Sequence, residues 1–233
     1  ELARAADSFN AMQARINRLL DERTRTIGAI AHDLRTPLAR LSFRLHALPD
    51  EARDKASADI AEMNTMITAA LDFLHGQSQR GPRSRLDFAS LVESVAGDLA
   101  DTGHDVTVTA SEPALVSGDP LALRRALSNL IDNALKYGQH ARLRLQREGG
   151  NVVLDVDDDG PGIDPAREDE LFLPFARGEE SRNRDTGGIG LGLSVAHSVV
   201  LDHGGTLRLR NRDDGGLRAT LSLPCLSPDL ANG

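Results

Sequence analysis

The chain has 233 residues, of which 40% are apolar, enough for one large domain or two ordinary ones with their own cores. Only 3% are aromatic and none is Trp, so Leu, Ile, Val and Ala must supply the core, which favours long helices and an α/β layer. The net charge of −8 argues against a nucleic-acid-binding protein, and a single cysteine excludes an internal disulfide. No run of about 18 apolar residues is present, so no membrane segment is predicted.

The first third of the chain has the composition and the periodicity of two helices. Residues 2–48 contain one glycine and one proline, and apolar residues recur every three or four positions at Ile27, Ile30, Leu34, Leu38, Leu41, Leu45 and Leu48. A second helical pattern spans residues 51–75, and the two together predict a helical hairpin. Neither helix can bury its apolar stripe against one partner, so we expect two hairpins to form a four-helix bundle in a homodimer. The alternative is a bundle completed by later helices of the same chain.

A change of composition and of period marks a second domain. Residues 76–85 are polar with Gly and Pro, which is typical of a linker. Beyond them the sequence predicts helices near 88–99, 120–137 and 194–201, and strands near 106–109, 114–116, 141–147, 151–156, 206–210 and 217–223. This is an α+β pattern, a mixed sheet with helices on one face. The predicted boundaries are 1–20 for the end of an incoming helix, 21–77 for the hairpin, 78–85 for the linker, 86–227 for the second domain and 228–233 for a tail.

The strongest predicted helix of the second domain carries a polar stripe. Asn129, Asn133 and Lys136 are spaced i, i+4 and i+7, so they share one face. Two carboxamides and an ammonium on one face can offer oxygen to a hard cation and positive charge to phosphates. Taken alone, the stripe also fits the solvated face of an ordinary helix.

Two glycine-containing segments follow. The strand near 151–156 runs into Asp157-Asp158-Asp159-Gly160-Pro161-Gly162, where the glycines permit a tight turn and Asp158 could accept a hydrogen bond from a base amino group. Thr186-Gly187-Gly188-Ile189-Gly190-Leu191-Gly192-Leu193 precedes a helix, where uncovered amide groups at the N-terminus favour phosphate. Residues 177–185 between them are polar and predict a lid. Each segment by itself also fits a plain turn.

In this order the three segments resemble the N, G1 and G2 boxes of the nucleotide-binding fold shared by histidine kinases, gyrase, Hsp90 and MutL. Leu171-Phe172-Leu173-Pro174-Phe175-Ala176-Arg177 looks like the F box that kinases place before the lid. The resemblance implies an α/β sandwich of the Bergerat type that binds ATP and Mg²⁺. It implies Asn133 as the Mg²⁺ ligand, Asn129, Lys136 and Arg177 near the phosphates, Tyr137 beside the nucleotide and Asp158 on the adenine amino group. The remaining implied nucleotide contacts are Gly160, Gly162, Gly188, Gly190, Leu191, Gly192 and Leu193.

One residue indicates which branch of that superfamily the chain resembles. Members such as Hsp90 and MutL that hydrolyse ATP carry a Glu one turn before the metal-binding Asn, and this chain has Asn129 there. An amide cannot take a proton from water at neutral pH, so we expect a different acceptor for the phosphoryl group. An ATPase of the Hsp90 type is disfavoured for this reason.

The acceptor is predicted at Ala31-His32-Asp33-Leu34-Arg35-Thr36-Pro37. His32 lies two residues from both Ile30 and Leu34, roughly 200° around the helix from the apolar stripe, so its ring should point outward. Asp33 can orient the ring and accept its proton, and Thr36 lies one turn further on the same face. Pro37 removes a helical hydrogen bond and gives the helix a place to bend. The chain's other histidines have no such neighbours.

This segment resembles the H box of histidine kinases, and the hairpin resembles their dimerisation and phosphotransfer domain. The resemblance, which spans essentially the whole chain, implies that His32 is phosphorylated from ATP and passes the phosphoryl group to the receiver domain of a response regulator. It implies that Asp33 and Thr36 also serve in dephosphorylating that regulator, and that residues 1–20 are the end of a HAMP relay. The expected setting is the cytoplasmic part of a longer protein anchored in a bacterial inner membrane, since the chain begins at Glu1 rather than Met. The competing hypothesis is a non-catalytic dimeric scaffold with a degenerate pocket.

Overall fold

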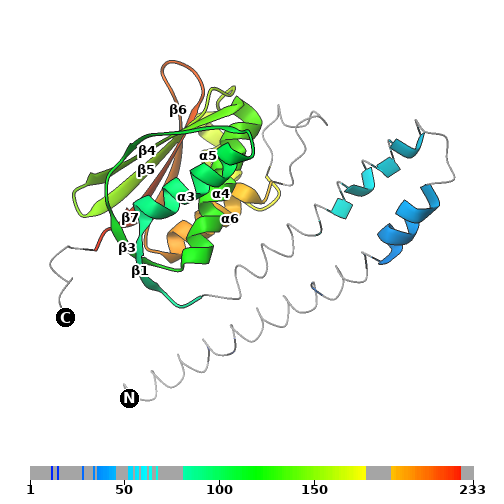
Figure 1. Ribbon diagram of the computed structural model, residues 1–233, viewed down its shortest axis with the longest axis horizontal. Helices are drawn as coiled ribbons and strands as arrows, with labels where there is room; N and C mark the ends of the chain where they lie inside the picture. The colour runs from blue at the N-terminus through cyan, green and yellow to red at the C-terminus, as the bar shows by residue number, and fades with distance from the viewer. Residues whose placement is uncertain are drawn as a thin grey trace. The chain divides into compact units, whose positions relative to one another are not determined.

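The computed structural model describes residues 81–176 and 190–226 without a break, and in the N-terminal part residues 12, 15, 28, 34, 36–45, 52–54, 56, 57, 59–61, 63, 64 and 67. The chain divides into two compact units, Glu1–Arg80 and Gly81–Gly233 (Figure 1). All of the described residues of the first unit are helical, as the sequence predicts. Leu38 is buried within this unit, whereas Leu34 and Leu41 of the same apolar stripe are 46% and 50% exposed. The four-helix bundle remains a prediction.

The second unit is built around a five-stranded mixed sheet with strand order β2-β4-β5-β7-β6. The strands are β2 (Asp105–Ser111), β4 (His140–Glu148), β5 (Asn151–Asp157), β6 (Thr206–Asn211) and β7 (Leu217–Pro224). Only β2 and β4 are parallel, and the other neighbours are antiparallel. Three helices, α3 (Phe88–Asp101), α4 (Pro120–Gly138) and α6 (Gly192–Asp202), cover one face of the sheet (Figure 1). This confirms the predicted mixed sheet with helices on one face.

The core lies between the sheet and these helices, because apolar residues alternate along the strands. Leu143, Leu154, Leu221 and Leu207 belong to four neighbouring strands, face the helices and are at most 2% exposed. Phe88, Leu123, Leu127 and Ile131 meet them from the helices and are fully buried. Side chains of the opposite parity point to the other face, where Arg144, Asp155 and Thr220 stand side by side in register.

The structure adds one strand that the sequence did not predict. Ser84 and Arg85, assigned above to the linker, open β1 (Ser84–Asp87), which pairs with β3 (Leu115–Gly118) in a separate two-stranded sheet. β1 is short and mostly exposed, so its sequence has no alternation of apolar residues that would predict a strand. Its strand conformation comes from backbone pairing with β3. A 3₁₀ turn, η1 (Pro165–Arg167), and the short α5 (Glu168–Leu171) then cover the edge strand β6, where Oε1 of Glu168 accepts a hydrogen bond from the Leu209 amide at 2.9 Å.

Both ends of α4 are fixed by specific residues. Asp119 is the N-cap: its Oδ1 accepts hydrogen bonds from the amides of Leu121 and Ala122 at 3.0 and 3.3 Å, and its Oδ2 accepts one from Gly81 at 2.9 Å. Its own amide donates to Nε2 of His203 just after α6, at 3.0 Å. At the other end Gln139 adopts φ +65° and lets the chain turn directly into β4. The position of α4 is therefore fixed by contacts with Gly81 at the start of the unit, with His203 after α6, and with β4 through the turn at Gln139.

Replacing Asp119 by Ala should lower the free energy of unfolding by about 1–2 kcal/mol, because three backbone amides lose their acceptor. The chain has one Tyr, Tyr137 on α4, and no Trp, so tyrosine emission during urea unfolding reports on this helix. The exposed Asp105 gives a matched control, since Asp105→Ala should stay within about 0.5 kcal/mol of the parent. Equal unfolding curves for the two variants would contradict the capping role.

Candidate functional site

Helix α4 carries the polar stripe that the sequence predicts. Asn129, Asn133, Lys136 and Tyr137 are all half-buried, which is neither the burial of core residues nor the exposure of a fully solvated face. The Lys136 ammonium lies 5.0 Å from the centre of the Tyr137 ring, which places a cation beside an aromatic face. This face of α4 is therefore partly accessible, so a ligand can contact it.

The N-terminus of α6 lies against this face of α4. A Cβ built on Gly192, the first residue of α6, would be 3.5 Å from Oδ1 of Asn129, an ordinary van der Waals contact, so the start of α6 lies directly beside Asn129. The N-cap residue Leu191 makes no side-chain capping bond, and Ser194 donates its hydroxyl to the Leu191 carbonyl at 2.8 Å instead of accepting from an amide. The first-turn amides of α6 thus receive no side-chain cap from the described residues. With the helix dipole, they form a site for anionic oxygens.

A buried carboxylate lies at the C-terminal end of α4. Asp158 follows β5 directly, is only 5% exposed, and accepts hydrogen bonds at Oδ1 from the amides of Gly160 at 2.7 Å and Leu217 at 3.2 Å. Burial raises the pKa of Asp158 above its ordinary value, and the two amide hydrogen bonds oppose that rise. None of the described residues donates a hydrogen bond to Oδ2, so this oxygen can accept one from a ligand.

The Asp158 turn touches the end of α4 because glycine stands at the contact. A Cβ on Gly138 would lie 2.6 Å from Cβ of Asp158, and one on Gly160 would lie 3.0 Å from the Tyr137 carbonyl oxygen. The rise of 1.5 Å per residue puts Asn129 and Gly138 about 13 Å apart along the helix. The C-terminal half of α4 therefore joins a hydrogen-bond acceptor at the end of the helix to an anion site beside its middle, a separation that suits an extended nucleotide.

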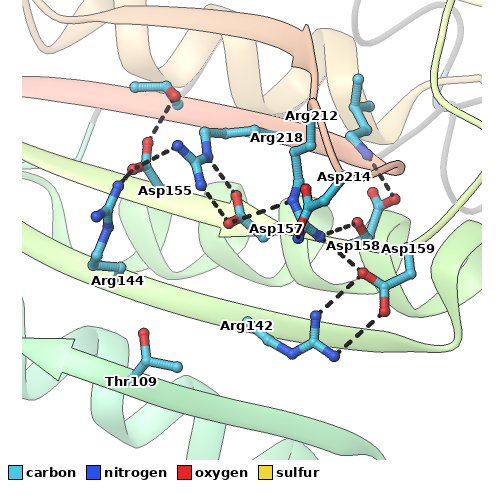
Figure 2. Close-up of polar contacts among 12 residues, drawn as sticks. Thr109, Arg142, Arg144, Asp155, Asp157, Asp158, Asp159, Arg212, Asp214 and Arg218 are labelled. Atoms are coloured by element: carbon cyan, nitrogen blue, oxygen red, sulfur yellow. Dashed lines mark hydrogen bonds and ion pairs between the residues drawn. The ribbon is translucent and has the colours of Figure 1, made fainter.

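Figure 2 shows a network of charged residues on the sheet face opposite the helices, running from β5 into the same turn. Arg144 donates to Asp155 at 2.7 Å, and Arg218 makes two bonds of 2.6 Å to Asp157. Asp159 is paired with His140, Arg142 and Arg212. These partners, His140 first, lower the pKa of Asp159 to about 2, so it is ionised at neutral pH.

The described residues on either side of the predicted lid, 177–185, also meet. The Phe175 amide donates to the Gly190 carbonyl at 3.0 Å, and Gly190 adopts φ +72°, where a Cβ would be 2.3 Å from the Ala176 carbonyl oxygen. Phe172 stacks on His197 of α6 with ring centres 4.2 Å apart. The segment between Ala176 and Gly190 thus begins and ends beside the N-terminus of α6.

The structure brings together most of the described residues that the sequence assigned to the site. Asn129 meets Gly192, Tyr137 meets Gly160, and Gly190 and Leu191 lead into α6, with Leu191 buried and Leu193 half-buried in its first turn. Thr36 is helical and exposed. Gly162 lies against the end of β6, since a Cβ there would be 2.6 Å from Oδ1 of Asn211. The predicted His32, Asp33, Arg177 and Gly188 lie outside the described residues.

Three residues that hold the Asp158 turn were missed. They are Gly138 at the end of α4, and Asn211 and Arg212 at the end of β6. Arg212 could be predicted only from the strand order. β6 pairs with β7 and β7 with β5, so the end of β6 lies near the end of β5. Within the described part of the chain, no group of three or more His, Cys, Asp or Glu side chains could hold a metal. No helix in that part is both long and apolar enough to span a bilayer.

Comparisons with known proteins give a consistent result. Residues 118–227 match the family model described as histidine kinase-, DNA gyrase B-, and HSP90-like ATPase. The sensor histidine kinase GtrS of Pseudomonas aeruginosa is 42% identical over 228 residues, covering 97% of this chain and 47% of GtrS. The chain spans about half the length of the curated relatives it matches.

Solved structures extend the comparison. The Acinetobacter baumannii histidine kinase AdeS is 27% identical, with a TM-score of 0.58 over 84% of this chain and 98% of that one. The histidine kinase domain of the Escherichia coli osmosensor EnvZ is 30% identical, with a TM-score of 0.50 over 64% of this chain and 92% of that domain.

Replacing Asp158 by Asn should raise the free energy of unfolding of the ligand-free protein at pH 7.5, by about 1 kcal/mol. The amide oxygen can still accept from Gly160 and Leu217, while the cost of burying a charge disappears. Because the folded-state pKa of Asp158 is raised, its destabilising effect grows as pH rises above about 4 and is absent below it. Urea unfolding at pH 7.5 and at pH 3.5 measures the difference in stability and its dependence on pH, with the exposed Asp213→Asn as control. A variant less stable than the parent at pH 7.5 would contradict the burial cost.

Proposed function

Since the chain belongs to the sensor histidine kinases, a family of ATP-dependent protein kinases, we propose that it binds Mg-ATP in residues 86–227 and phosphorylates its own His32. The observation that carries the proposal is the placement, along one helix, of the buried Asp158 carboxylate and of the N-terminus of α6, whose first turn has no side-chain cap among the residues that the structure describes. Base and phosphates of one nucleotide can occupy these two sites together.

At the base end, Oδ2 of Asp158 accepts a hydrogen bond from the exocyclic amino group of adenine. Tyr137 lies beside the base, and Gly160 lets the Asp158 turn approach the Tyr137 carbonyl closely because it has no side chain. A 6-oxo purine presents an acceptor instead of a donor to the same carboxylate, so the site selects against it.

At the phosphate end, the amides of Gly192 and Leu193, with Lys136 and Arg177, bind the phosphate oxygens, and Asn129 and Asn133 face them from α4. Asn133 would hold Mg²⁺ through its carboxamide oxygen, and the ion would supply positive charge next to the phosphates. The first-turn amides of α6 are already oriented toward the negative charge of the phosphates.

The acceptor is an imidazole nitrogen of His32. A nitrogen–phosphorus bond forms as the bond between the γ-phosphorus and the bridging oxygen breaks, ADP leaves, and Asp33 takes the imidazole proton. Asn129 stands where a water-activating Glu would be needed, so the site lacks the base for hydrolysis. The reaction is catalysed by positioning and by charge neutralisation.

We further propose that the hairpin dimerises as a four-helix bundle and passes the phosphoryl group to an aspartate in the receiver domain of a response regulator. Leu34, Leu41 and Met63 are 46%, 50% and 49% exposed within one chain, which supports a second copy covering them. Thr36, helical and exposed, positions water with Asp33 when the regulator is dephosphorylated. We also propose that the chain is the cytoplasmic part of a longer membrane-anchored sensor, with residues 1–20 as the end of a HAMP relay.

Replacing His32 by Gln should reduce incorporation of label from [γ-³²P]ATP to background, because the acceptor nitrogen is lost. Binding of Mg-ATP and the oligomeric state should not change, because the sequence assigns His32 to the hairpin rather than to the nucleotide-binding domain and its spacing predicts that it lies outside the apolar stripe. Acid lability of the label identifies the phosphorus–nitrogen bond. The exposed His104→Gln is the matched control and should label like the parent. Acid-labile label on the His32→Gln protein would exclude His32 as the acceptor.

Replacing Asn133 by Ala should weaken binding of ATP in the presence of Mg²⁺ at least about tenfold, or about 1.4 kcal/mol, because the metal loses its protein ligand. Binding measured without Mg²⁺ should change much less. Calorimetry with and without Mg²⁺ separates the loss of metal binding from a general loss of ATP binding, with the exposed Asn151→Ala as control. Equal affinities with Mg²⁺ for the Asn133→Ala protein and the parent would remove Asn133 from the metal site.

A further inference from the structure

The turn that carries Asp158 is held by two consecutive residues at the end of β6. The Asn211 carboxamide accepts a hydrogen bond from the Ile163 amide at 2.8 Å and donates one to the Ile163 carbonyl at 2.7 Å. Arg212 holds the opposite end of the turn, donating from Nη1 to the Asp158 carbonyl at 2.8 Å and to Oδ1 of Asp159 at 2.8 Å. Residues 158–163 are therefore fixed at both ends by one strand terminus.

The contacts of Arg212 determine how the Asp158 side chain is presented. A single guanidinium nitrogen binds the backbone oxygen of Asp158 and the side chain of Asp159, which fixes the peptide plane between them. That plane sets the direction in which the Asp158 side chain leaves the backbone. The Arg212 side chain is only 13% exposed, and its Nη2 donates to Asp214 at 2.5 Å, which holds the guanidinium in place (Figure 2).

The turn between β6 and β7, which follows Arg212, supplies the remaining contacts to Asp158. The Arg212 amide donates to the Gly216 carbonyl at 3.0 Å and closes the turn between β6 and β7. Gly216 adopts φ +88°, and a Cβ there would be 1.9 Å from the Asp158 carbonyl oxygen, the same oxygen that Arg212 binds. The next residue, Leu217, donates its amide to Oδ1 of Asp158 and accepts from the Asp158 amide at 2.9 Å. With Oδ1 held from this side, Oδ2 is the oxygen left for the ligand.

The geometry points to Arg212 as a positioning residue for nucleotide recognition: it fixes the Asp158 turn so that Oδ2 accepts the adenine amino group. This inference rests on the proposed function, because it needs Asp158 to contact adenine. Arg212 does not touch the nucleotide itself. Losing it should therefore reduce the part of the affinity that depends on the amino group and leave the phosphate end unchanged.

The test compares ATP with purine riboside triphosphate, which lacks the 6-amino group, by calorimetry on the whole chain in the presence of Mg²⁺. The parent should bind ATP at least about tenfold more tightly than the analogue, since a hydrogen bond to a charged group is lost. Arg212→Gln should weaken ATP binding about tenfold and change analogue binding by less than about twofold. Arg212→Lys keeps the charge without the planar fork and should give an intermediate ratio. Asp158→Asn, which can keep Oδ1 as an acceptor but turns an amino group toward the base, should abolish the preference for ATP.

Arg210→Gln is the matched control: Arg210 is exposed on the same strand, and the variant makes the same charge change. Equal weakening of both nucleotides by Arg212→Gln would show a merely structural role and overturn the inference, and so would behaviour indistinguishable from Arg210→Gln. If the Gln variant does not fold, the comparison of Arg212→Lys with the parent decides, and an unchanged ratio overturns the inference. A parent chain that binds both nucleotides equally would instead overturn the adenine contact in the proposed function, and this inference with it.

Discussion

The second unit depends on one carboxylate, Asp158, that is buried directly after the central strand β5. An ionised carboxylate is tolerated there only if backbone amides and nearby cations offset its lost hydration. Asp158 has this support from the amides of Gly160 and Leu217, and Arg212 lies beside it. The glycines at 138 and 216 follow from the same requirement, because any side chain there would overlap the turn. The residual cost of burial appears as the raised pKa of Asp158, and a ligand that donates a hydrogen bond to Oδ2 lowers that cost.

Three consecutive aspartates receive different roles from the two-residue period of a strand. Asp157 points to the outer sheet face and forms an ion pair with Arg218, and Asp159 continues that parity and meets Arg142 and Arg212. Asp158 has the opposite parity and lies against the end of α4 on the helix-covered side. A slip of one residue would place a paired surface carboxylate in the pocket and move the recognition carboxylate to the surface. The outer network of arginines and aspartates thus keeps β5 in the register that the pocket needs.

The sequence predicts those parts of the site that depend on local periodicity. The spacing of Asn129, Asn133 and Lys136 needs only the helical repeat, and the glycines before α6 need only their position at a helix start. Arg212 could not be found in this way, because its role depends on the order β5-β7-β6, which joins residues more than fifty positions apart. β1 was missed for a related reason: its residues show no apolar alternation, and its strand conformation comes from pairing with β3. The described residues of the first unit were predictable as helix, since composition and period agree there.

The length of α4 links recognition to transfer. The helix is capped by Asp119 at one end and turned by Gln139 at the other, so the distance between the Asp158 turn and the N-terminus of α6 is set by a rigid rise rather than by loops. A base that binds at the C-terminal end of α4 therefore places its phosphates at a fixed depth beside the middle of the helix, and a contact that orients the base also orients the reacting phosphorus. The described residues on either side of segment 177–189 meet at the phosphate site, where Phe175 and Gly190 are joined by a hydrogen bond. Selection of the nucleotide and presentation of its phosphates are thus assigned to two places on one helix, and the contacts that hold α4 fix the distance between them.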